Sequence, residues 1–201
     1  MHPTAPYVVP WKEETLPDLD TMVGSFGVAY TNPLHDTFQR DKDGILWAVC
    51  EGTRTGGPAY ARELHPHRQR EAMERLLCAG CSGPPARDER GMLWVLPLLD
   101  DGDDPGWHCV RTVIPPMCEP CKTKATEACP WLRDGHVELR VKEAEKIGVR
   151  GTLYPLPGVE DEPDPDALVL FNTPEEGRVI ARQLVRELRE VTVIAVRRST
   201  P

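Results

Sequence analysis

The sequence predicts an α+β fold, and three observations indicate it. Short runs rich in β-branched and aromatic residues recur along the chain, an amphipathic stretch lies at about 67–78, and two Cys-x-x-Cys pairs lie at 78–81 and 118–121. The 201 residues fit one domain with an extension. Prolines without a clear period at 1–33 predict an extended arm, so we expect one compact domain over 34–201.

A hairpin and a helix are expected between the arm and the first cysteine pair. Runs at about 36–40 and 45–50 flank the turn signal DKDG, which predicts two strands joined by a hairpin turn. Pro66 precedes the amphipathic stretch at 67–78, so this stretch predicts a helix that leads directly into the first pair. The apolar face of this helix consists of Ala72, Met73, Leu76 and Leu77.

Further strands are expected between and after the two pairs. GMLWVLPL and WHCVRTVIPP predict two strands joined by the acidic turn LDDGDDPG, and CEPCKTKATEAC predicts a helix that ends at PWL. HVELRV and KIGVRGTLYPL predict two more strands, followed by an acidic linker. Small antiparallel strands should therefore surround the cysteine pairs.

The C-terminal region predicts a strand–helix–strand unit. LVLFN and VTVIAV are strand-like, and TPEE between them forms a capping box with Thr173 at the cap. Ile180, Leu184 and Leu188 then recur at every fourth residue, the spacing of one helix face. Such a unit is usually scaffold.

The cysteine pattern predicts one structural Zn²⁺ bound by Cys78, Cys81, Cys118 and Cys121. Four thiolates satisfy Zn²⁺ tetrahedrally, and we expect Gly80 and Gly83 to supply the positive φ angles of a knuckle turn. Knuckle, hairpin and helix follow one another in the order of a treble clef, at about 76–131. A redox pair or free thiols are the alternatives, but neither explains why two pairs occur. A closed four-sulfur site cannot activate water, so its expected role is folding.

The stretch MCEPCKTKA resembles the end of zinc-containing HNH endonucleases. That family carries an Asp-His or His-His pair in the first strand of its hairpin and a histidine after the last cysteine pair. Here 91–101 holds no histidine and Lys122 follows Cys121. The resemblance covers 78–130 and implies the structural half of the module without its catalytic residues. The stretches HPHRQREAMERLLCAGC and CPWLRDGHVELRV also resemble uncharacterised actinobacterial zinc proteins with four cysteine ligands, which implies no activity.

Another interpretation is a nucleic-acid-binding regulator related to degenerate HNH treble clefs, which would use a basic patch near the zinc. Its residues are Arg68, Arg70, Arg75, Lys122, Lys124, Arg133 and Arg140. Trp107 or Trp131 would offer a surface for base stacking. The alternative is that these side chains pair with interleaved glutamates, as Arg70 and Glu74 would at i, i+4. The net charge of −8 counts against broad binding to nucleic acid.

An enzyme is the alternative from another class. Its best reactive residues are Cys50, His65, His67 and His108, although no catalytic or phosphate-binding motif accompanies them. The cysteines outside the zinc set are Cys50, Cys109 and Cys129. We expect them to be small core residues; a second metal site with a histidine is the other interpretation.

The leading expectation is a non-catalytic binding or adaptor protein that uses a zinc core as scaffold for a protein or nucleic-acid partner. The N-terminus lacks the pattern of a signal peptide, and the apolar run LWVLPLL is far shorter than the roughly 18 residues of a membrane span. We therefore expect a cytoplasmic protein, where reduced cysteines favour metal binding over disulfides.

Overall fold

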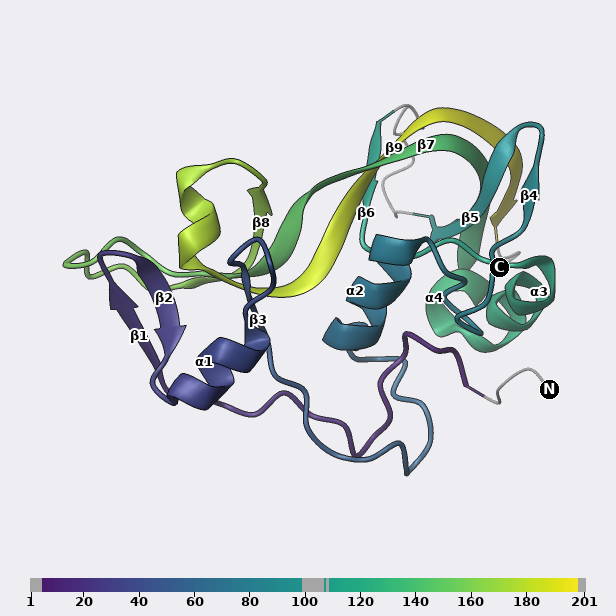
Figure 1. Cartoon of the computed structure of the whole chain (residues 1–201). Helices are drawn as coiled ribbons and strands as arrows, with labels where there is room; N and C mark the ends of the chain where they lie inside the picture. The colour runs from purple at the N-terminus through teal and green to yellow at the C-terminus, as the bar shows by residue number, and fades with distance from the viewer. Residues whose placement is uncertain (1–4, 99–106, 108, 199–201) are drawn as a thin grey trace.

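A long antiparallel ribbon organises the molecule (Figure 1). The computed structural model describes residues 5–98, 107 and 109–198. Strands β7 (Gly135–Leu153) and β9 (Val179–Arg198) pair along nearly their whole lengths. Three register shifts interrupt this pairing, and irregularities of this kind bend a strand and increase its twist. The ribbon therefore curves through the molecule and connects two lobes.

The ribbon is the centre of a seven-stranded sheet. On the β7 side lie β5 (Gly91–Pro97), β4 (Arg87–Asp88) and β8 (Asp164–Leu170). On the β9 side lie β3 (Leu46–Trp47) and β6 (Val110–Thr112). A separate hairpin consists of β1 (Thr21–Gly24) and β2 (Gly27–Tyr30). The helices are α1 (Pro33–Gln39), α2 (Pro66–Arg75), α3 (Glu119–Ala128), α4 (Pro130–Arg133) and the 3₁₀ turn η1 (Pro174–Arg178). The fold is thus α+β and mostly sheet.

Helix α2 lies between the two lobes and packs on both (Figure 1). One lobe contains β1, β2, α1, β3, β8 and η1, and the other contains β4 to β6, α3 and α4. Met73 of α2 packs in the core of the first lobe with Val149 and Leu184. Its neighbour Ala72 packs on the other side with the buried cysteines.

The predicted helix at 67–78 is confirmed, with different ends. His65 caps it by accepting the N–H of Arg68, and Pro66 is its first residue. Leu76 ends it in the left-handed conformation, with φ of 52°. The helix expected from the second cysteine pair is also confirmed as α3, which begins after Cys118 and ends before Pro130.

The prediction of a strand at 36–40 is wrong, because this segment belongs to α1. The side chain of Asn32 accepts the N–H of Leu34 at 3.0 Å, and Pro33 fixes the first helical φ. The DKDG turn is present and brings Arg40 opposite Leu46, but the second strand shortens to β3. The expected arm at 1–33 also contains the β1–β2 hairpin.

The strands predicted on either side of the acidic turn do not pair with each other. Strand β5 pairs with β4 and β7, whereas β6 pairs with β9. The acidic turn itself, at 99–106, lies outside the described residues. The two strands expected at 136–141 and 146–156 are one continuous strand, β7.

The C-terminal helix prediction is wrong, because 179–198 forms strand β9. A spacing of four residues is also a multiple of two, so Ile180, Leu184 and Leu188 can share one side of a strand as well as one face of a helix. Thr173 does lie at the cap position, but it caps only η1. Its hydroxyl donates to the carbonyl of Leu170 at 2.8 Å instead.

We predict that Gln69→Leu destabilises the protein by about 3 kcal/mol, because three backbone groups lose their partner. The fully buried Gln69 amide donates to the carbonyls of Val113 (2.6 Å) and Leu184 (2.9 Å) and accepts the N–H of Leu184 (2.9 Å). Urea unfolding would measure the loss. His67→Leu, at an exposed position of the same helix, should change stability by less than about 0.5 kcal/mol; equal effects would contradict the prediction.

Candidate metal centre and adjoining cavity

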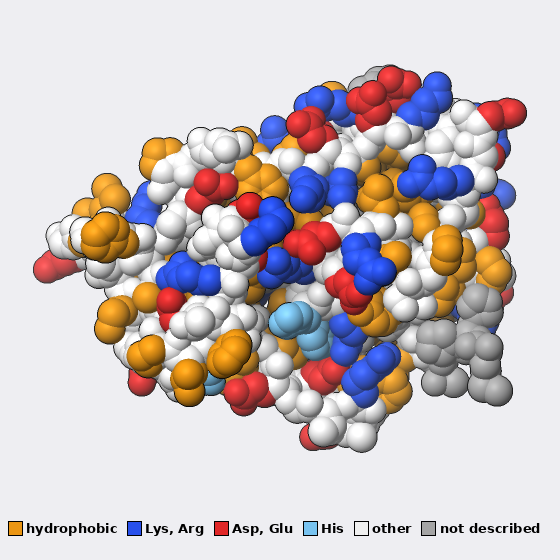
Figure 2. Space-filling view, in the orientation of Figure 1, with side chains coloured by type: hydrophobic (Ala, Val, Ile, Leu, Met, Phe, Trp, Pro, Cys, Tyr) orange, Lys and Arg blue, Asp and Glu red, His pale blue; other side chains and the backbone are white. Residues whose placement is uncertain are grey.

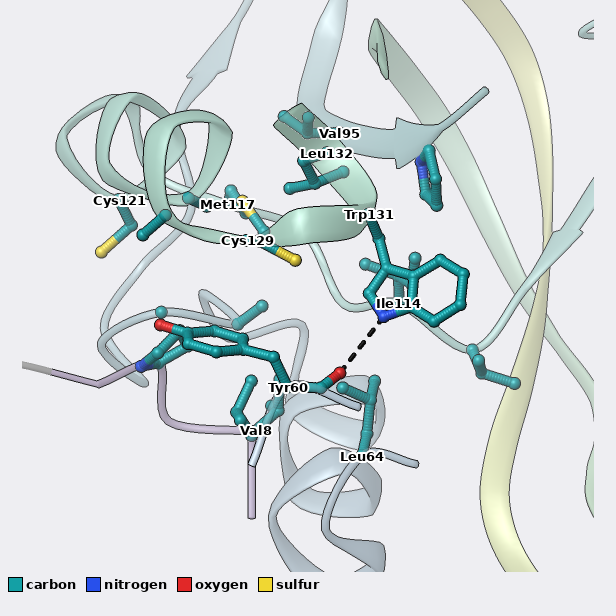
Figure 3. A pocket seen from close by; sticks show the side chains of 18 of the residues that line it. Val8, Tyr60, Leu64, Val95, Ile114, Met117, Cys121, Cys129, Trp131 and Leu132 are labelled. Atoms are coloured by element: carbon teal, nitrogen blue, oxygen red, sulfur yellow. Dashed lines mark hydrogen bonds between the residues drawn. The ribbon is translucent and has the colours of Figure 1, made fainter. Parts of the chain in front are cut away.

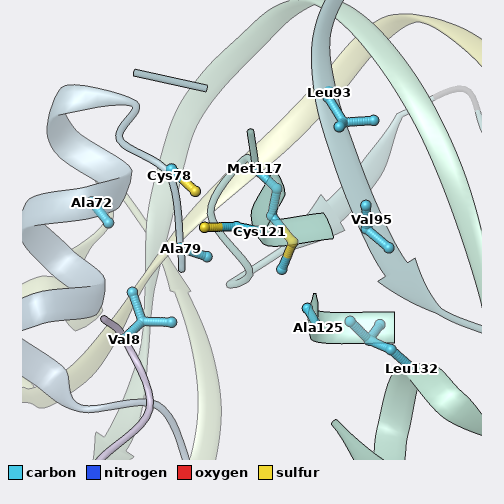
Figure 4. Close-up of a cluster of buried hydrophobic side chains, with 10 residues drawn as sticks. All are labelled: Val8, Ala72, Cys78, Ala79, Leu93, Val95, Met117, Cys121, Ala125 and Leu132. Carbon is cyan, nitrogen blue, oxygen red and sulfur yellow. The ribbon is translucent and has the colours of Figure 1, made fainter. Parts of the chain in front are cut away.

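The four predicted cysteines converge on one point. The sulfurs of Cys78, Cys81, Cys118 and Cys121 all lie within 4.8 Å of one another. Cys118 Sγ lies 3.6 Å from Cys78 Sγ and 3.8 Å from Cys81 Sγ; a tetrahedral ion with bonds of about 2.3 Å places its ligands about 3.8 Å apart. Figure 4 shows Cys78 and Cys121 pointing toward each other among apolar side chains. The cluster can therefore hold a metal ion.

Backbone turns place these sulfurs. In the knuckle, Cys78 N–H donates to the carbonyl of Gly83 (2.7 Å), and Ser82 N–H donates to the carbonyl of Cys78 (2.9 Å). Cys118 is the N-cap of α3, so its partner Cys121 lies in the first turn of that helix. The N–H groups of Gly80 and Cys118 point at Cys78 Sγ from 3.4 and 3.3 Å. Such donors stabilise a thiolate.

The expected role of the knuckle glycines is wrong. Ser82, with φ of 56°, takes the left-handed conformation, and neither Gly80 nor Gly83 does. Gly80 is required for another reason, because a Cβ there would lie 2.6 Å from Cys121 Cβ and 2.7 Å from its sulfur. The glycine thus lets the knuckle approach α3.

Burial and the neighbouring thiols raise the pKa of Cys121 above its ordinary value. A bound cation would act against this effect, because a positive charge stabilises a thiolate. The donor set fits a soft tetrahedral ion, which would hold all four sulfurs as thiolates.

The predicted basic residues are mostly ion-paired. Arg68 donates to both carboxylate oxygens of the buried Glu14 at 2.6 Å. Arg70 and Arg75 pair with Glu74 (2.9 Å) and Glu71 (2.6 Å) on the same helix, as the alternative interpretation expected for Arg70. In Figure 2, basic and acidic side chains alternate across the visible face.

The remaining basic residues surround α3 and α4. Lys122 bridges Glu119 (2.9 Å) and Glu138 (2.8 Å), and Arg140 also pairs with Glu119 (2.7 Å). Arg133 lies 3.9 Å from Asp134. Of the seven predicted residues, Lys124 alone has no ion pair within the described part of the chain. These cations are largely neutralised by their neighbours.

Among the described candidates for reactive residues, Cys50 and His65 lie near each other but make no hydrogen bond to one another. Cys50 and His65 line one cavity of about 500 Å³, and burial raises the pKa of Cys50 and lowers that of His65 to about 4. His65 Nδ1 accepts the N–H of Arg68 and Nε2 lies 3.8 Å from Glu14, so both ring nitrogens face other groups. His67 is exposed, and His108 lies outside the described residues.

The prediction that the other three cysteines are core residues is wrong for Cys109 and holds in part for Cys129, which packs against a buried cluster. Cys109 is exposed, and Cys50 and Cys129 are only partly buried. Cys129 lines the larger cavity described next.

A larger cavity, of about 530 Å³, lies directly beside the cysteine cluster (Figure 3). Its lining is mainly apolar and comes from residues 5–9, 60–64, β5, α3 and α4. The Trp131 indole N–H donates to the carbonyl of Tyr60 at 3.2 Å, which joins two walls. The sequence did not predict this cavity, because its walls come from segments far apart in the chain. Of its lining, only Trp131 and Lys124 had been singled out as candidates for binding.

The segment at 5–9 is tied to the knuckle, and we call it the strap. The N–H groups of Tyr7 and Val8 donate to the carbonyls of Gly80 (2.9 Å) and Ala79 (3.1 Å), both between the first two cysteines. The carbonyl of Val8 in turn accepts the N–H of His65 at 2.8 Å. The cysteine knuckle therefore holds one wall of the cavity in place.

No family model matches this chain, and neither a curated protein nor a solved structure matches it significantly. Within the described residues, no helix combines the length and the apolarity that crossing a membrane requires.

We predict that Gly80→Ala lowers metal affinity at least about tenfold, because its Cβ would displace Cys121. Titration with Co²⁺, followed by its thiolate absorption and competed with a chelator, measures the affinity. Gly83→Ala is the matched control, since its Cβ would lie at an ordinary 3.4 Å from Cys81 Sγ. Equal affinities of the two variants would refute this explanation of Gly80.

We predict that stability falls as the pH drops from about 6.5 to about 4. The pKa of His65 is lowered from 6.5 to about 4, so the unfolded chain binds a proton in this range and the folded chain does not. His65→Asn keeps a capping side chain and should remove about 2 kcal/mol of this pH dependence. Unfolding by urea at a series of pH values, on both proteins, measures the difference; parallel pH profiles would exclude His65 as the source.

Proposed function

We propose that this chain is a non-catalytic binding protein in which one structural Zn²⁺ supports a cavity that receives an apolar group. The observation that carries the proposal is that α3 serves both sites. Cys121 belongs to the metal cluster and also lines the cavity, together with Ala125 and Ala128 of the same helix. The metal would hold this wall, and the strap on the knuckle would hold the wall opposite.

The identity of the metal rests on its donors. Four thiolates in a closed tetrahedral set favour Zn²⁺, whose expected contribution is folding free energy. The order of the elements, knuckle, β4–β5 hairpin and helix α3, supports a treble-clef module. A reducing compartment, the cytoplasm, would keep these cysteines available as thiolate ligands.

Binding is favoured over catalysis by the chemistry of the cavity. Its volume of about 530 Å³ lies in the range of small-molecule sites, and its lining is mainly apolar with few polar groups. A closed four-sulfur site offers no position for a reacting water. The ion pairs of the basic residues likewise favour an apolar ligand over nucleic acid.

Elemental analysis of the purified protein tests the metal. We expect one zinc per chain, and none in Cys118→Ser, which should also aggregate or unfold because metal binding and folding are coupled. A folded Cys118→Ser protein without metal would contradict a structural role. Iron in place of zinc, or a second metal, would contradict the proposed cofactor.

Uptake of a neutral fluorescent probe, N-phenyl-1-naphthylamine, tests the cavity. Ala128 lines the cavity from an exposed position of α3, so Ala128→Phe adds a ring to the lining and should lower probe affinity at least about tenfold. Glu127→Phe adds the same ring at an exposed position of α3 outside the cavity lining, and it should bind like wild type. The absence of probe uptake by the wild-type protein would refute the proposed function.

A further inference from the structure

Two cavities adjoin at one short segment. The apolar cavity of about 530 Å³ and the second cavity of about 500 Å³ share Arg62, Glu63 and Leu64 in their linings. Cys121 of the metal cluster lines the first cavity but not the second. Arg62 therefore lies where the apolar cavity adjoins the second one.

Most charges around the apolar cavity are already compensated. Glu63 pairs with Arg182 at 2.8 Å, and Arg150 pairs with Asp166 at 2.6 Å. Lys124 lies one turn after Cys121 in α3, where its charge would offset that of a divalent metal bound by four thiolates. Apart from Lys124, the cation of the lining without a carboxylate partner among the described residues is the Arg62 guanidinium.

The Arg62 guanidinium is nevertheless held in place. Its Nη1 donates to the carbonyls of Lys12 (3.1 Å) and Glu14 (2.7 Å), which are neutral groups. These bonds fix one nitrogen, and within the described part of the chain the Nε and Nη2 donors have no acceptor. A guanidinium edge of this kind matches the two oxygens of a carboxylate.

We infer that the natural ligand is a small monocarboxylic acid whose apolar body fills the cavity and whose carboxylate binds Arg62. This inference rests on the proposed function, and it adds the charge and the orientation of the ligand. Tyr60 and Trp131 line the apolar part and suit an aliphatic chain or an aromatic ring. The acidic overall charge of the protein gives no general attraction for anions, so selectivity for an acid would come from Arg62 itself.

Competition for the bound neutral probe by decanoate, decanol and decylamine tests the inference. These compounds have the same chain and differ in the head group. On the wild-type protein we expect decanoate to displace the probe at a concentration at least about tenfold lower than decanol, with decylamine the weakest, because a charge-assisted hydrogen bond favours the acid. In Arg62→Gln the preference for decanoate over decanol should vanish while the probe still binds. Arg87→Gln removes an exposed arginine outside both cavities and should keep the preference.

The outcomes separate this inference from the proposed function. Equal displacement by decanoate and decanol, or a preference for decylamine, would overturn the inference on the wild-type protein alone, while probe binding would still support the cavity. A preference for decanoate that survives in Arg62→Gln would also overturn it. No binding of the probe at all would overturn both.

Discussion

The pairing of β7 with β9 is the constraint on which the rest of the structure depends. Each strand is about three times the usual length of a strand in a globular protein, and each carries different partners along its other edge. Near one end of the ribbon β5 extends the sheet, and near the other end β3 and β8 do, while β6 pairs with the middle of β9. The two lobes thus share one continuous hydrogen-bonded element instead of a flexible linker. Helix α2 fills the angle between them, and buried Gln69 fixes it to β9 through backbone groups.

The cysteine cluster is a second, local constraint, and it acts on helices α3 and α4. Helices α3 and α4 are short, and α3 buries only Cys121 and Ala125. The four sulfurs add contacts between α3 and the knuckle that compensate for this small apolar area. Two backbone hydrogen bonds then fix the strap to the knuckle. The apolar cavity lies between these parts. Its shape therefore depends on the cysteine cluster and the few residues bonded to it more than on close packing.

The sequence predicted correctly those elements that depend on residues close together in the chain. Cysteine spacing identified the cluster, and caps and prolines identified α2 and α3. The failures came where partners distant in sequence decide the structure. Apolar residues at every fourth position suit a helix or a strand equally, and only pairing with β7 makes 179–198 a strand. The cavity and the role inferred for Arg62 could not be predicted for the same reason. Arg62 bonds to the distant Lys12, and it lines one cavity with Gly80 and Trp131 only in the folded chain.

The position of β9 in the chain has a consequence for protein synthesis. This strand bonds to β3, β6 and β7, yet it is the last of the described strands to leave the ribosome. Until it emerges, three strands expose edges and apolar faces that it later covers, and unpaired edges favour association with other chains. The cysteine cluster, complete well before β9 is made, can form earlier. A metal bound during synthesis would then order this part of the nascent chain before the sheet is complete. The sheet would be completed only when β9 pairs with its partners.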